Sequence, residues 1–136
     1  MIKTIAACLA FALMASRPHA LHGVVCIDLA PGLEAYDVSG FANAGGRAIL
    51  IHGERDSDVP AREAIAVLES FESTFGGAVR AAGAMRLFVV PDAGRSAAGY
   101  FDGRLDLAEP IERWLDWTPR RPPDVLVLHD ARDGAS

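Results

Sequence analysis

Apolar residues cluster in short blocks along this chain, and the blocks predict strands separated by helices. Three apolar runs, at residues 24–27, 47–52 and 86–90, have the length of buried strands, and each has glycine or proline at one end or both. A run that is apolar at every position is typical of a strand covered on both faces of a parallel sheet. The order of strand, helix and strand therefore predicts an α/β fold with helical layers.

Two helices are predicted from apolar positions at helical spacing. The first begins at Pro60, which suits the first helical position, and ends at Gly76-Gly77; its expected apolar face is Ile65, Leu68, Phe71 and Phe75. The second spans residues 107–117 and has the expected apolar face Leu107, Ile111, Trp114 and Leu115. Residues 92–103 show no periodicity, and residues 125–128 are a candidate for a further short strand.

The first twenty residues have two interpretations. Lys3 followed by the apolar run of residues 4–15 has the form of a secretory signal, which would make the protein secreted or periplasmic. The same residues also have the form of a helix that ends near Arg17-Pro18, because proline disfavours helix in the residue before it. That helix would lead into the strand at 24–27, and the protein would then be cytoplasmic. Both interpretations stay open at this point.

Composition limits the classes of function. The 136 residues suffice for one domain, and 18 acidic against 13 basic residues give a net charge of −5. An acidic chain without a basic cluster argues against nucleic acid and against an anionic membrane surface as partners. The cysteines Cys8 and Cys26 and the histidines His19 and His22 form no complete metal-ligand pattern, so neither a metal nor a cofactor is predicted.

One short motif carries candidate chemistry. Residues 53–60 read G-x-x-D-x-x-V-P and follow the strand at 47–52, so Asp56 is expected at the carboxyl end of a buried strand. Parallel α/β sheets place their chemistry at that edge. The alternative is that Asp56 only accepts hydrogen bonds from turn amides. Asp58 is expected to be a turn or cap residue, and His52 a structural residue at the strand end.

Three segments of the chain resemble the tannase and feruloyl esterase family of α/β-hydrolases. They are residues 37–53 with their Gly-Gly-Arg step and His-Gly, the G-x-x-D-x-x-V-P turn, and residues 85–94 followed by Trp114 and Pro-Pro-Asp at 122–124. The resemblance implies a partial α/β-hydrolase fold that corresponds to the C-terminal part of the domain, with the nucleophile half missing. Residues 21–130 would be this part, residues 131–136 a tail, and residues 1–20 either a signal peptide or the remnant of the helix after the nucleophile.

The resemblance also assigns site residues. Asp56 matches the acid of a Ser-His-Asp triad, and Arg95 stands where the family has its histidine. An arginine stays protonated and has no lone pair to act as a general base, although it can pair with Asp56. The nucleophile motif G-x-S-x-G occurs nowhere. Ser96 is the remaining candidate nucleophile, with Asp124 and His129 behind it.

Two functions of different classes follow. The first is a carboxylic-ester hydrolase-like protein for esters of aromatic acids, truncated and catalytically weak or inactive, whose partner would be a small aromatic ester. The second is a small non-catalytic α/β module that binds a ligand or another chain. Open sheet edges would allow such a module to associate with itself.

Overall fold

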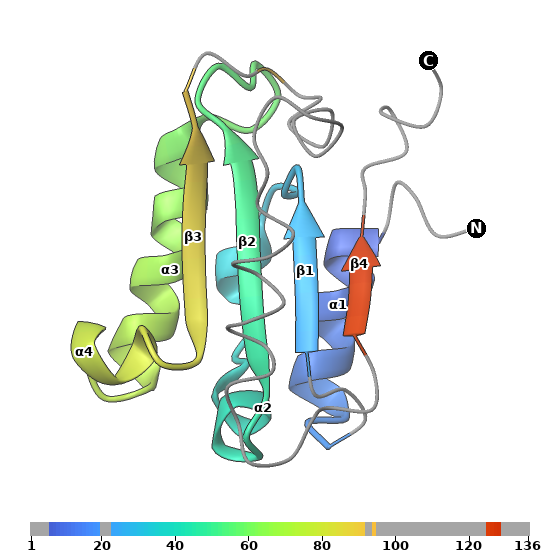
Figure 1. The fold of residues 1–136 in the computed structure, drawn as a ribbon, viewed down its shortest axis with the longest axis vertical. Coiled ribbons are helices and arrows are strands. Elements are labelled where there is room, and N and C mark those ends of the chain that lie inside the picture. Colours follow the sequence, from blue (N-terminus) through green and yellow to red (C-terminus); the bar gives the residue numbers. More distant parts are fainter. Residues whose placement is uncertain (1–5, 20–22, 92–93, 95–124, 129–136) are drawn as a thin grey trace.

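Four parallel strands form one sheet in the computed structural model, which describes residues 6–19, 23–91, 94 and 125–128. The strands are β1 (Gly23–Ile27), β2 (Arg47–Gly53), β3 (Met85–Val90) and β4 (Val125–Leu128), in the order β3-β2-β1-β4 (Figure 1). Val25 of β1 is aligned with Ile49 of β2 and with Val127 of β4. The predicted α/β class with a parallel sheet is confirmed, including the short strand at 125–128.

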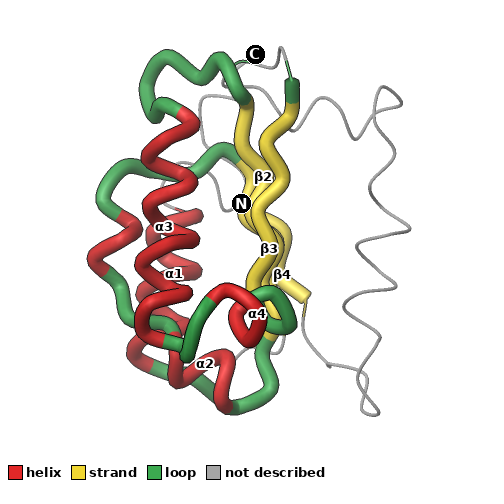
Figure 2. Tube along the Cα trace, turned by 90° about the vertical axis from the view of Figure 1, so that its left-hand side faces the viewer, coloured by secondary structure: helices red, strands yellow, loops and turns green. Residues whose placement is uncertain are grey.

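The helices α1 (Ala6–Ser16), α2 (Ser39–Asn43) and α3 (Ala61–Thr74) cover one face of this sheet (Figure 2). Strands β1, β2 and β3 are neighbours in chain order, so each new strand is added on the same side of the previous one. Because the crossovers between parallel strands are right-handed, the helices that connect these strands lie on the same face of the sheet. The turn η1 (Leu33–Ala35) packs against α3 in the same layer. The predicted helix at 107–117 lies outside the described residues.

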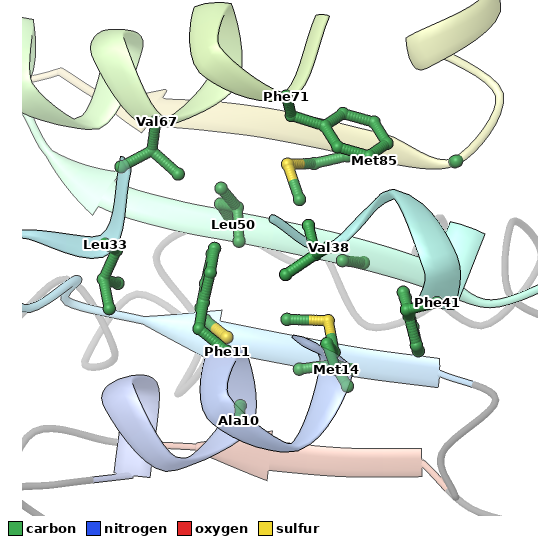
Figure 3. Packing of buried hydrophobic residues seen from close by; sticks show 14 of the residues in the cluster. Ala10, Phe11, Met14, Leu33, Val38, Phe41, Leu50, Val67, Phe71 and Met85 are labelled. Atoms are coloured by element: carbon green, nitrogen blue, oxygen red, sulfur yellow. The ribbon is translucent and has the colours of Figure 1, made fainter. Parts of the chain in front are cut away.

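The main core lies between the helices and the sheet. Side chains alternate between the two faces of a strand, so every second strand residue enters this core. Figure 3 shows how side chains from the sheet meet those from α1, α2 and α3; the buried cluster includes Phe11, Met14, Val24, Cys26, Val38, Phe41, Ala48, Leu50, Val67, Phe71 and Met85. Residues far apart in the sequence thus share one apolar layer.

The intervening residues of the central strands are buried as well. Val25, Ile27, Ile49 and Ile51 point to the face opposite α1–α3 and are at most 2% exposed. Burial on both faces explains why β1 and β2 are continuous apolar runs. The edge strand β3 instead leaves Arg86 and Phe88 exposed.

Helix α1 belongs to the core. It ends at Ser16, directly before Arg17-Pro18, as the helical interpretation of this segment predicted. Its side chains Ala10, Phe11 and Met14 are at most 1% exposed. Among the helices described, none combines the length and the apolar character that crossing a membrane requires.

Helix α3 forms where it was expected, and of its predicted apolar face Phe71 and Phe75 are buried and Leu68 packs against the core, whereas Ile65 was wrong. Ile65 is 42% exposed, whereas Ala64, Val67 and Phe71 are buried. Ala64 is fully buried in the core cluster, so the face of α3 that carries it is turned toward the sheet. Pro60 is the residue that precedes the first helical turn, not the first helical position.

The end of α3 follows the expected glycine mechanism. Gly76 and Gly77 both have positive φ, at 92° and 101°, and the Gly77 amide donates to the Glu72 carbonyl oxygen at 2.8 Å. Glycine adopts such angles without a steric penalty. The short helix α4 (Ala78–Ala81) follows, and it was not predicted because a single turn has no periodicity to recognise.

Replacing Gly46 by alanine is expected to lower the free energy of unfolding by about 1–3 kcal/mol, because the site is already filled. A Cβ there would lie 2.5 Å from the ring of Phe41, which is 1% exposed and has no free space to move into. Urea unfolding measures the change. Gly83→Ala is the matched control, since its Cβ would make only an ordinary contact of 3.5 Å. Equal effects of the two substitutions would contradict the prediction.

Candidate functional site

Buried polar side chains gather at one edge of the sheet. Within the described part of the chain, the buried polar or charged residues are Asp28, His52 and Asp56, with exposures of 1%, 0% and 4%. Asp28 directly follows β1, His52 is near the end of β2, and Asp56 lies in the loop after β2. Burying such groups costs free energy unless they are hydrogen-bonded. The three side chains therefore need polar partners at this edge of an otherwise apolar fold.

Asp56 closes the turn between β2 and α3. Its amide donates to the Gly53 carbonyl oxygen at 3.2 Å. Its Oδ1 accepts hydrogen bonds from the amides of Asp58 at 2.9 Å and Val59 at 3.0 Å. The Val59 side chain is 1% exposed and anchors the far end of the turn. Asp56 therefore accepts hydrogen bonds from turn amides, and these bonds fix the direction of its carboxylate.

The imidazole of His52 is held at both ring nitrogens. Nδ1 accepts a hydrogen bond from the Leu29 amide at 3.2 Å, so the ring proton is on Nε2. Nε2 lies 2.6 Å from the Val59 carbonyl oxygen, to which it donates, and 3.5 Å from Asp56 Oδ2. The ring is fully buried and both nitrogens are directed at backbone groups, so neither nitrogen is presented to a substrate. His52 is thus a structural histidine, as expected.

Asp28 was not identified from the sequence. It has a left-handed backbone conformation with φ of 60°, which is uncommon for residues other than glycine and is tolerated best by Asn and Asp. Its amide donates to the Ile51 carbonyl oxygen at 2.9 Å, which continues the ladder between β1 and β2. The sequence feature that could have identified Asp28 is its position as an acidic residue directly after the apolar run at 24–27.

The remaining candidate residues are not brought to this edge by the described structure. Arg95, Ser96, Asp124, His129 and His22 lie outside the described residues. His19 is exposed after α1. Across the described ranges, no three His, Cys, Asp or Glu side chains are close enough to hold a metal ion.

Asp37, which opens the first resembling segment, has a local role. The hydroxyl of Ser39 donates to Asp37 Oδ1 at 2.6 Å and the Ser39 amide donates to the same oxygen at 3.0 Å. These two hydrogen bonds, the hydroxyl first, lower the pKa of Asp37 below its ordinary value. The side chain is exposed, two residues before Ser39 at the start of α2, and it is not one of the buried polar residues.

A shallow hollow of about 200 Å³ lies elsewhere, between α3 and the outer side of β3. Its lining is Leu68, Glu72, Ala82, Met85, Arg86, Leu87 and Phe88. None of the three buried polar residues Asp28, His52 and Asp56 lines this hollow. The candidate site is therefore defined by the carboxyl edge of β1 and β2 and not by this hollow.

Comparison with known proteins gives consistent matches. The model of the family "Tannase and feruloyl esterase" matches residues 21–135. Mono(2-hydroxyethyl) terephthalate hydrolase of Piscinibacter sakaiensis is 31% identical over 85 residues, which is 62% of this chain and 14% of that protein. A protein of unknown function from Agrobacterium tumefaciens, described as an α/β-hydrolase, superposes with a TM-score of 0.59 at 20% identity; the match covers 90% of this chain and 51% of that one. The chain thus spans about one seventh of the length of the first of these proteins and about half of the second.

Proposed function

Since this chain belongs to the tannase and feruloyl esterase family, we propose that it carries the acid-bearing part of a site that hydrolyses carboxylic esters of aromatic acids. The observation that carries the proposal is the buried Asp56 turn at the carboxyl end of β2. The named relative from Piscinibacter sakaiensis acts on an ester of terephthalic acid, which is an aromatic acid, and this supports the substrate class.

Asp56 is proposed to orient a catalytic histidine. In a Ser-His-Asp triad the acid accepts a hydrogen bond from the histidine Nδ1–H, fixes its tautomer and stabilises the imidazolium that forms. Two backbone amides hold Asp56 Oδ1, so the carboxylate has one direction before any histidine arrives. His52 is not that histidine, because its Nδ1 already accepts from the Leu29 amide.

The nucleophile and the base are the open part of the proposal. Arg95 stands at the family's histidine position and cannot act as a base, and no G-x-S-x-G is present. Ser96 is therefore the candidate nucleophile within this sequence. We expect the chain on its own to hydrolyse esters weakly or not at all, with residues 21–130 as the hydrolase part.

Hydrolysis of methyl ferulate, methyl gallate and a p-nitrophenyl alkyl ester by the purified chain tests the proposal. Any turnover is expected to favour the two aromatic-acid esters and to fall with Asp56→Asn. Ser96→Ala decides the nucleophile: loss of turnover assigns it to Ser96, and unchanged turnover excludes Ser96. A preference for the alkyl ester, without dependence on Asp56, would contradict the proposed function.

A non-catalytic module is the second candidate, and the exposure of strand β3 favours it. Phe88 is 36% exposed on this edge strand, beside the hollow between α3 and β3. An exposed strand edge with an apolar side chain is a site for pairing with another chain. Ester turnover that depends on Asp56 would exclude this candidate.

A further inference from the structure

The loops that leave β1 and β2 are joined by the side chain of His52. Its Nδ1 accepts from the Leu29 amide in the first loop, and its Nε2 donates to the Val59 carbonyl oxygen in the second. The two bonds are 3.2 and 2.6 Å long, and the ring is fully buried between them. A single imidazole thus fixes the distance between the two chain segments that border the candidate site.

On the β1 side, the ring replaces a backbone acceptor. The Asp28 amide still donates to the Ile51 carbonyl oxygen, as the last bond of the ladder between the two strands. Asp28 then turns the chain with a φ of 60°, and the next amide, that of Leu29, meets His52 Nδ1. Without the ring acceptor this buried amide would lose its hydrogen bond to Nδ1, which costs about 1–3 kcal/mol for a group of this kind.

On the β2 side, one residue links the ring to the candidate acid. The carbonyl oxygen of Val59 accepts from His52 Nε2, while the amide of Val59 donates to Asp56 Oδ1. Asp56 Oδ2 lies 3.5 Å from the same Nε2. A shift of the imidazole would therefore move the Val59 peptide and, through it, the Asp56 carboxylate.

We propose that His52 is a positioning residue, which orients Asp56 by holding its turn against the exit of β1. The proposal rests on the proposed function in so far as Asp56 is the triad acid. The donor Nε2–H is the essential part of the ring, because it is the group that faces both Val59 and Asp56. The acceptor Nδ1 secures the ring from the other side.

Three substitutions of His52 distinguish a positioning residue from a side chain that only fills space. His52→Gln can keep a donor near the Nε2 position, His52→Asn can keep an acceptor near the Nδ1 position, and His52→Leu fills the volume with neither. His19→Gln, at an exposed position, is the matched control. Amide hydrogen exchange of the full chain measures how well the turn is held. The protection of the Asp58 and Val59 amides depends on their hydrogen bonds to Asp56 Oδ1.

The expected result is a local effect. In His52→Leu and His52→Asn the Asp58 and Val59 amides should exchange about tenfold faster or more, and this acceleration should exceed that of the amides within β1 and β2. His52→Gln should restore most of the protection. Equal acceleration of turn and strand amides, or protection in His52→Leu as good as in His52→Gln, would show that the ring only fills space and would overturn the proposal.

Two further measurements keep the proposal testable. Nitrogen NMR of the unmodified chain should show His52 with its proton on Nε2 alone, and a proton on Nδ1 would overturn the proposal even if no variant folds. Where the chain hydrolyses an ester, His52→Leu should lower kcat about as much as kcat/KM. Where no turnover is detected, which the proposed function allows, the exchange result alone decides the role of His52.

Discussion

Replacing Phe11 by alanine is expected to lower the free energy of unfolding by about 3–5 kcal/mol, the usual cost of removing a buried phenylalanine. Phe11 is 1% exposed in the core cluster (Figure 3). Its ring lies 6.4 Å from that of Tyr36 at an angle of 61°. The loss combines the apolar surface returned to water with the cavity left between α1 and the sheet. A domain of this size has only about 5–15 kcal/mol of stability, so the variant is expected to be close to unfolding.

Chemical denaturation with urea, followed by circular dichroism, measures this effect. Leu9→Ala is the matched control on the same helix, because Leu9 is 39% exposed and its loss is expected to cost less than about 0.5 kcal/mol. The comparison also bears on the first twenty residues. If α1 is part of the folded protein, Phe11→Ala destabilises it and Leu9→Ala does not. Equal effects of both would indicate that this segment is not in the folded core, as expected of a signal peptide.

Replacing Asp56 by asparagine is expected to reduce ester turnover by about 10⁴ in kcat where that turnover uses a histidine oriented by Asp56, as in triads whose acid is neutralised in this way. Asparagine retains an oxygen for the amides of Asp58 and Val59, so the turn should persist while the negative charge is lost. The remaining amide group can orient a histidine in the wrong tautomer. The rate should therefore fall much more than the stability.

Steady-state kinetics and urea unfolding of the same preparations separate the two effects. Asp56→Ala, which removes both oxygens from a buried turn, is expected to lower the free energy of unfolding by about 1–3 kcal/mol. Asp58→Asn is the control, because Asp58 is an exposed neighbour whose amide, and not its carboxylate, binds Asp56. Turnover by Asp56→Asn at the rate of the unmodified chain would exclude Asp56 as the triad acid.

The sequence alone identified the strands and the helix α3 of the described fold, but not the short helices α2 and α4. Strands β1 and β2 were visible because a strand buried on both faces must be apolar at nearly every position. Strand β3 was visible as a short apolar run that ends at Pro91. Helix α3 was visible from its apolar spacing and from Pro60 and the two glycines that bound it. The Asp56 turn was visible because its residues are neighbours in the chain, so a local motif specifies its geometry. The family followed from the same motifs.

Only the tertiary structure decided how these elements meet. The rotation of α3, which buries Val67 and exposes Ile65, depends on contact with the sheet and not on the helix itself. Strand β4 pairs with β1, about a hundred residues earlier in the chain. The bond between the Leu29 amide and His52 joins residues 23 positions apart. Such pairings depend on which segments the fold brings together, and hydrophobic periodicity reports only on the local chain.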